Sequence, residues 1–171
     1  MKKIFLIFLS LFFTTSLHAK DQELHSVSKV IEANVIELDS KEIVRLIGIH
    51  IPEGNTPDTP QSKWNQKSKT FVEKILKDRK VWIENPKSKQ DEQGRTWVYL
   101  YFNAPLKEIQ PLLDRSFIPF GTGGDFMLNR MLIEQGYGSV ESPFSFKYRS
   151  TFSELESKAR SKQIGMWEDL R

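Results

Sequence analysis

The sequence predicts an α+β fold that is mainly β, with about five strands and about three packed helices. β-branched residues alternate with polar ones over residues 27 to 49, a segment with apolar residues at helical spacing follows, and two more helical segments lie near the end. Strands first, with one helix among them and two after, favour a small barrel with helices packed on it. The spacing of apolar residues alone does not distinguish this barrel from another α+β arrangement.

The first half of the chain is read as strands followed by a helix. Residues 27 to 49 form two or three antiparallel strands that break at 39 to 41, and the prolines of 52 to 60 predict a loop. A helix over 62 to 77 then presents one apolar face, made of Trp64, Phe71, Val72, Ile75 and Leu76. Residues 81 to 84 read as the next strand.

The second half is read as one more strand and two helices. A charged loop over 86 to 94 leads into a strand over 96 to 102. Asp125 is the expected N-cap of a helix that ends at Gly136. Thr151 and Glu154 have the spacing of a capping box for a last helix, which stops at Gly165 and turns Phe152, Leu155 and Ala159 inward.

The N-terminus has the pattern of a secretory signal peptide. Two lysines precede an almost wholly apolar run over 4 to 13, and small and polar residues follow up to Ala19. The run is too short to span a bilayer. We therefore expect residues 1 to 19 to be cleaved, and an exported chain, periplasmic or secreted, without stable membrane insertion. Residues 20 to 171 then have the length of one domain, which we expect to be monomeric.

Composition excludes several kinds of chemistry. The chain has no cysteine, so disulfides, cysteine nucleophiles and thiolate zinc sites are all excluded. The formal net charge of +3 falls to about +1 without Lys2 and Lys3 of the signal segment. Global charge therefore gives no argument for binding nucleic acid, and attraction to phosphate must come from local groups.

Three charged residues at predicted strand ends suggest a phosphate site. Arg45 lies in the apolar segment 44 to 51, Glu53 follows Pro52 in the next turn, and Arg95 precedes the strand over 96 to 102. An arginine donates two hydrogen bonds to phosphate and stays protonated at any working pH. A carboxylate accepts a proton from water or orients it. Each residue alone also fits a surface turn or a structural salt bridge.

These segments resemble the staphylococcal nuclease (thermonuclease) family, from about residue 27 to residue 167. The resemblance rests on V-R-L-I-G-I-H-I-P-E at 44 to 53, D-E-Q-G-R at 91 to 95, N-R-M-L-I-E-Q-G at 129 to 136 and A-R-S-K-Q-I-G-M-W at 159 to 167. It implies a five-stranded OB-fold barrel, with Arg45, Glu53 and Arg95 on the three catalytic positions. Residues 103 to 124 exceed the family's short turn and are read as an insertion, either a rim loop near the site or an inert surface excursion.

The resemblance also implies calcium, but two ligand positions differ. Asn34 and His50 stand where the family has aspartates. Calcium requires hard oxygen ligands, and carboxylates make its sites tight, so the family's calcium site is not expected unchanged. Three alternatives stay open: Glu32 replaces the missing carboxylate at a weaker divalent site; His50, Glu32 and Glu53 hold a transition metal; or the site works without metal and His50 is an acid, a base or an ordinary polar residue.

The sequence therefore predicts an exported phosphodiester hydrolase that cleaves DNA or RNA with little sequence preference. Arg45 and Arg95 would bind the phosphate, and Glu53 would act as the base or orient water. The alternative keeps the fold without catalysis, as a module that binds nucleic acid or protein. Asn34 and His50 favour that alternative, and retention of Arg45, Glu53 and Arg95 argues against it.

Overall fold

The computed structural model describes residues 22–54, 56–85, 89–113 and 123–169 of the 171-residue chain. The predicted signal segment, residues 1 to 19, lies outside the described residues. Within those ranges, no helix has both the length and the apolar character that crossing a membrane requires.

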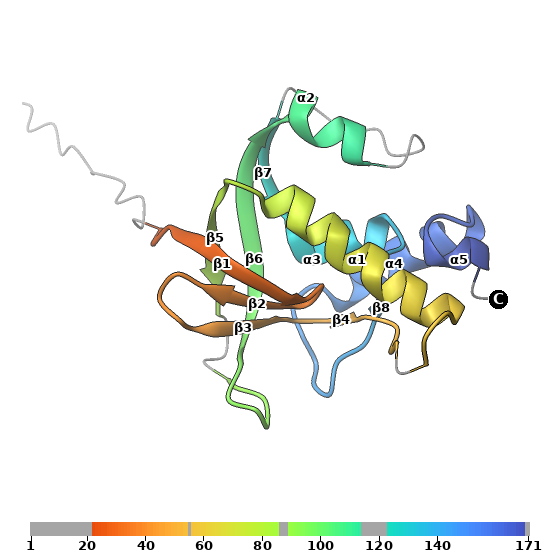
Figure 1. Ribbon diagram of the computed structural model, residues 1–171, viewed down its shortest axis with the longest axis horizontal. Helices are drawn as coiled ribbons and strands as arrows, with labels where there is room; N and C mark the ends of the chain where they lie inside the picture. The colour runs from red at the N-terminus through yellow and green to blue at the C-terminus, as the bar shows by residue number, and fades with distance from the viewer. Residues whose placement is uncertain (1–21, 55, 86–88, 114–122, 170–171) are drawn as a thin grey trace, which may run out of the picture.

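Five strands close into a barrel (Figure 1). Neighbouring strands pair antiparallel in the order β3-β2-β1-β5-β6, and a parallel pairing of β3 with β6, with Arg45 opposite Trp97, closes the circle. The closure confirms the predicted barrel. Its strands are β1 (His25–Glu32), β2 (Val35–Leu38), β3 (Ile43–Leu46), β5 (Lys80–Glu84) and β6 (Thr96–Pro105).

Buried apolar side chains of the strands form the core of the barrel. Burial alternates along β3, as the sequence pattern predicted, whereas residues 96–100 of β6 are all buried. Ile36, Leu38, Val44, Leu46 and Leu100 have no exposed surface. The predicted break between strands is also present: Lys41 takes a positive φ of 70° in the turn between β2 and β3.

Helices pack on the outside of the barrel (Figure 1). The predicted first helix is α1 (Pro60–Leu76), which begins where Thr59 accepts a hydrogen bond from the Ser62 backbone, and the five side chains of its predicted inner face are all buried. The chain also has α3 (Leu128–Glu134) and α4 (Arg149–Ser161), whose Phe152, Leu155 and Ala159 are buried as predicted.

Two more helices, α2 (Leu106–Ile109) and α5 (Met166–Asp169), have four residues each, so periodicity gave no signal for them. The described helices therefore number five, against the three predicted. A 3₁₀ turn, η1 (Gln110–Leu112), follows α2.

Two predicted helix starts are wrong. Asp125 caps no helix, because β6 continues to Pro105 and offers an edge on which residues 123–127 pair as strand β7 (Gly123–Met127). There Asp125 accepts a hydrogen bond from its cross-strand neighbour Asn103. Thr151 lies inside α4, which begins two residues earlier with Tyr148 as N-cap, where the Tyr148 ring stacks on the buried Phe152.

The region predicted as an insertion is only partly described. Residues 103–113 and 123–124 continue β6, form α2 and η1 and begin β7, while residues 114–122 lie outside the described residues. The described part lies at the end of β6 away from Arg95. At the opposite end of the molecule, two short strands, β4 (Ile49–His50) and β8 (Ser139–Val140), pair and bring residues 139–141 beside the segment that follows β3.

Candidate active-site pocket

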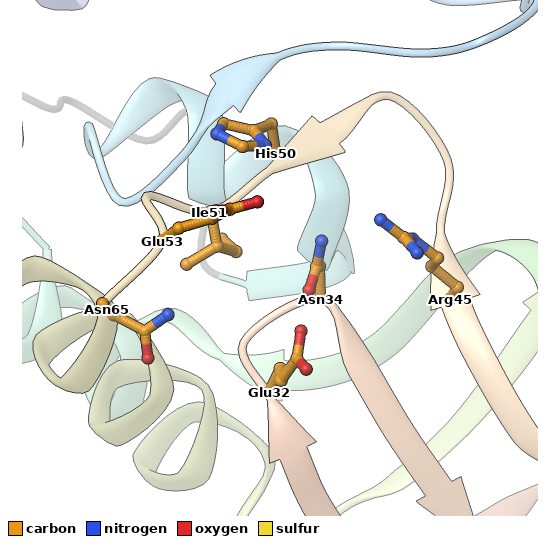
Figure 2. Close-up of a pocket in the computed structure, with 8 residues that line it drawn as sticks. Glu32, Asn34, Arg45, His50, Ile51, Glu53 and Asn65 are labelled. Carbon is orange, nitrogen blue, oxygen red and sulfur yellow. The ribbon is translucent and has the colours of Figure 1, made fainter. Parts of the chain in front are cut away.

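An open pocket of about 340 Å³ brings together most of the residues singled out in the sequence (Figure 2). It lies between the β1–β2 hairpin, β3, the segment that follows β4, and the first turns of α1. The residues that line it are Glu32, Asn34, Arg45, His50, Ile51, Glu53, Gly54 and Asn65. Predicted catalytic and predicted metal-binding residues thus share one pocket, and Arg95 alone does not line it.

Backbone turns position these side chains. Gly48, between β3 and β4, has a φ of +77°, and a Cβ there would lie 2.7 Å from the Phe146 ring, so glycine is required for the chain to turn from Arg45 toward His50. Asn34 lies in the turn after β1, not in the strand itself. Its Nδ2 donates to the Ile49 carbonyl at 3.0 Å, which ties the hairpin to β4.

Arg45 is held on two sides, and its Nε is a buried donor. Its Nη1 donates to Oδ2 of Asp91 at 3.3 Å, and its guanidinium carbon lies 5.0 Å from the centre of the Trp97 ring. Its Nε is buried and has no hydrogen-bond partner among the described residues. A buried donor without an acceptor is costly, so this N–H is suited to an anionic oxygen entering the pocket.

Among the described residues, Asp91 links Arg95 to Arg45, which lines the pocket. Arg95 Nε donates to the same Oδ2 that Arg45 contacts, and its Nη2 donates to Gln93 at 2.8 Å. Asp91 also accepts backbone hydrogen bonds from Gln93 and Arg95, both at 3.0 Å. Burial would raise the pKa of the Asp91 carboxyl, but the backbone and guanidinium donors of Arg95 and the Gln93 N–H together lower it below its ordinary value.

Glu53 lies on the far side of the pocket from Arg45. Figure 2 shows its side chain extending from the chain toward the middle of the pocket. The turn that carries it is fastened to α1, because Asn65 Nδ2 donates to the Pro52 carbonyl at 3.0 Å. An exposed carboxylate on a fastened turn is able to hold a water or to accept its proton.

His50, at the rim of the pocket, is engaged outside it. Its Nδ1 lies 2.9 Å from Oε2 of Glu141, in the chain that follows β8, and the side chain is 39 % exposed. This contact exists because β4 pairs with β8, with His50 opposite Ser139.

The pocket fits a hard divalent cation in part. Asn34 Oδ1 is buried without a hydrogen-bond partner among the described residues, and amide and carboxylate oxygens are ligands that calcium accepts. Glu32 and Glu53 add two carboxylates to the same pocket. No three His, Asp or Glu side chains of the described ranges gather closely enough to hold a metal, so the three-ligand transition-metal alternative gains no support.

Three residues of the site were missed in the sequence: Asp91, Asn65 and Glu141. Asp91 had a visible signal, since it lies four residues before Arg95 and opens the D-E-Q-G-R turn. Asn65 and Glu141 carried none, because their contacts join segments 13 and 91 residues apart.

The chain is similar to known proteins over most of its length. The family model described as staphylococcal nuclease homologue matches residues 43–169. A thermonuclease of Staphylococcus intermedius is 28% identical over 150 residues, covering 85% of this chain and 77% of the relative. A thermonuclease of Staphylococcus hyicus is 22% identical over 161 residues, covering 91% and 82%. An uncharacterized protein of Methanocaldococcus jannaschii is 27% identical over 162 residues, covering 82% and 70%.

Proposed function

Because the chain belongs to the staphylococcal nuclease homologue family, we propose that it hydrolyses phosphodiester bonds of DNA or RNA, with little sequence preference, in the pocket of Arg45 and Glu53. Two relatives named thermonuclease, similar over most of the chain, support this proposal.

One observation carries the proposal. Arg45, whose buried Nε has no acceptor in the described part of the chain, and the carboxylate of Glu53 line the same open pocket. Hydrolysis of a phosphodiester needs a donor for the phosphoryl oxygens, on which negative charge grows, and a base or anchor for the attacking water. The pocket contains both kinds of group, from different elements.

Each residue then has a role. Arg45 Nε donates to a phosphoryl oxygen while its Nη1 stays on Asp91, so the guanidinium is aligned before substrate arrives. Glu53 orients the water or takes its proton. Arg95 keeps its predicted role as a second phosphate ligand, and in the conformation described here it acts on the pocket through Asp91.

A divalent cation fits beside these groups through Glu32 and Asn34, in the same pocket as Glu53. When bound, such an ion would neutralise phosphoryl charge and lower the pKa of a bound water. We further propose that the protein is exported, from the signal-like pattern over residues 1 to 19.

The test is cleavage by the purified protein. Single-stranded DNA, duplex DNA and RNA are each incubated with chelator, calcium, magnesium, manganese or zinc. Glu53→Gln keeps the size of the side chain and removes its charge, and Arg45→Lys keeps the charge and removes Nε. The matched controls are Glu154→Gln and Arg130→Lys, which make the same changes on α4 and α3, outside the pocket.

Both pocket variants should lose about a hundredfold or more in rate, and both controls should cleave like the wild type. Cleavage that survives Glu53→Gln and Arg45→Lys would overturn the pocket assignment. No cleavage by folded wild-type protein under any condition would overturn the hydrolase and favour the module that binds without cutting. Salt-dependent affinity for nucleic acid would then be measured.

A further inference from the structure

We propose that the chain has replaced the ligand set at its cation site: Glu32 and the amide oxygen of Asn34 bind the divalent ion, and His50 does not. The inference rests on the proposed function only in placing the cation beside the phosphate pocket. It concerns which side chains hold the ion and how tightly.

Asn34 provides the first observation. The residue is 3% exposed, lines the pocket, and its Oδ1 has no hydrogen-bond partner among the described residues. The orientation of the amide is fixed, because Nδ2 donates to the Ile49 carbonyl and exchanging the two atoms would set two acceptors against each other. The described residues provide no donor for this oxygen, so it is available to a group that enters the pocket.

Glu32 provides the second observation. It lies at the end of β1, two residues before Asn34, and lines the same pocket. Figure 2 shows the side-chain oxygen of Asn34 on the side that faces the Glu32 carboxylate. The Glu32 carboxylate takes part in none of the ion pairs found among the described residues. An amide oxygen and a carboxylate that line one pocket both attract a cation, and the described residues offer the Asn34 oxygen no donor instead.

His50 is excluded by its partner and by its chemistry. Its Nδ1 is 2.9 Å from Glu141, on the β8 side of the rim. An imidazole nitrogen is also a poor ligand for calcium or magnesium, which take oxygen. His50 therefore links β4 to the chain that follows β8 at the rim of the pocket. The cation ligands come from the β1–β2 hairpin instead.

The affinity follows from the charges. One carboxylate and one neutral amide oxygen at the core of the site provide less charge than two aspartates, and Arg45 lines the same pocket. We expect binding of calcium in the range of weak sites, with a dissociation constant on the order of 10⁻⁴ to 10⁻³ M. Converting Asn34 to aspartate should tighten binding at least about tenfold, since an added carboxylate adds charge to the ligand set.

The experiment titrates calcium, and separately manganese, into the purified chain by calorimetry without nucleic acid. The variants are Glu32→Gln, Glu32→Asp, Asn34→Asp and His50→Gln. The control is Glu37→Gln, the same change on the adjacent strand β2, outside the pocket. Thermal unfolding with and without the ion is a second readout. Asn34→Asp removes the donor to Ile49, so this variant should melt lower without the ion and gain more from it than the wild type.

The proposal predicts that Glu32→Gln abolishes binding, Glu32→Asp weakens it, Asn34→Asp tightens it, and His50→Gln and Glu37→Gln bind like the wild type. Loss of binding in His50→Gln with retention in Glu32→Gln would overturn it. So would absence of binding in both the wild type and a folded Asn34→Asp variant. Cation binding without nucleic-acid cleavage would contradict the proposed hydrolase and support the cation site. Nucleic-acid cleavage without cation binding would contradict the cation site alone.

Discussion

Arg45 and Arg95 donate to the same carboxylate oxygen, Oδ2 of Asp91, from opposite sides of the β3–β6 closure. The two predicted catalytic arginines are therefore one charged unit. Asp91 is itself fixed by the backbone N–H groups of Gln93 and Arg95, and its side chain is only 8% exposed. A buried carboxylate that orders two cations prepares them for a second anion, because their side-chain freedom is already lost.

Replacing Asp91 should damage catalysis without touching the substrate. In Asp91→Asn both arginines lose their shared anchor, and we expect kcat/KM to fall by about tenfold to a hundredfold, the usual cost of losing a residue that orients a functional group. KM should rise with the fall in kcat, and Asp91→Glu should restore part of both. Asp39→Asn makes the same change at an exposed aspartate of the β2–β3 turn and should leave both constants unaltered. A wild-type rate in folded Asp91→Asn would refute the anchoring role.

The lowered pKa of Asp91 also predicts a pH dependence of stability. A carboxyl whose pKa is lower in the folded than in the unfolded chain stabilises the folded protein at pH values above its pKa in the unfolded chain. This contribution is lost as the pH falls through the pKa of the folded state. The difference in unfolding free energy between wild type and Asp91→Asn should therefore be constant above about pH 5. It should shrink as the pH falls below 3.8, the ordinary pKa of an aspartate carboxyl. Urea unfolding at a series of pH values measures this difference. If it grew toward acid pH, the assigned direction of the shift would be wrong.

The sequence predicted the barrel and α1 well because both leave a regular spacing of apolar residues along the chain. The alternation in β3 and the apolar face of α1 are local patterns that the buried side chains follow, whereas β1 has register shifts and is buried irregularly. Asp125 and Thr151 were misread because tertiary contacts outweighed capping propensity. Asp125 pairs with the edge of β6, and the ring of Tyr148, the residue before α4, packs on Tyr99 of β6. The motifs identified Arg45 and Glu53, which the structure places in one pocket, although no motif shows which residues anchor them.

Asn129, within the N-R-M-L-I-E-Q-G motif, should matter for stability. It is fully buried; its Oδ1 accepts from the Leu100 N–H at 3.0 Å, and its Nδ2 donates to the carbonyls of Ile47 and Val98 at 3.0 and 3.2 Å. Asn129→Ala removes the partners of the Leu100 N–H and the Ile47 carbonyl, whereas the Val98 carbonyl still accepts from the Ile47 N–H, so we expect a loss of about 2 kcal/mol or more. Asn103→Ala, at an exposed asparagine, should cost no more than about 0.5 kcal/mol. Equal losses in urea titrations of the two variants would contradict this role.

Two glycines with nearly the same φ separate backbone strain from close packing. Gly94 (φ +76°) and Gly136 (φ +64°) both adopt the left-handed conformation, so alanine at either should cost about 1 to 2 kcal/mol for conformation alone. A Cβ at Gly94 meets nothing within 4 Å, whereas one at Gly136 would lie 2.2 Å from the Ile164 carbonyl oxygen. That close approach docks the end of α3 against the chain before α5, where Met166 N–H donates to the Gly136 carbonyl at 2.9 Å.

Gly136→Ala should therefore be destabilised well beyond Gly94→Ala, since backbone and not a flexible side chain would have to move. Thermal unfolding of the two variants gives the comparison directly. If both melted at the same temperature, the contact between Gly136 and Ile164 would carry no stability, and the docking of α3 against the C-terminal segment would have to depend on side chains alone.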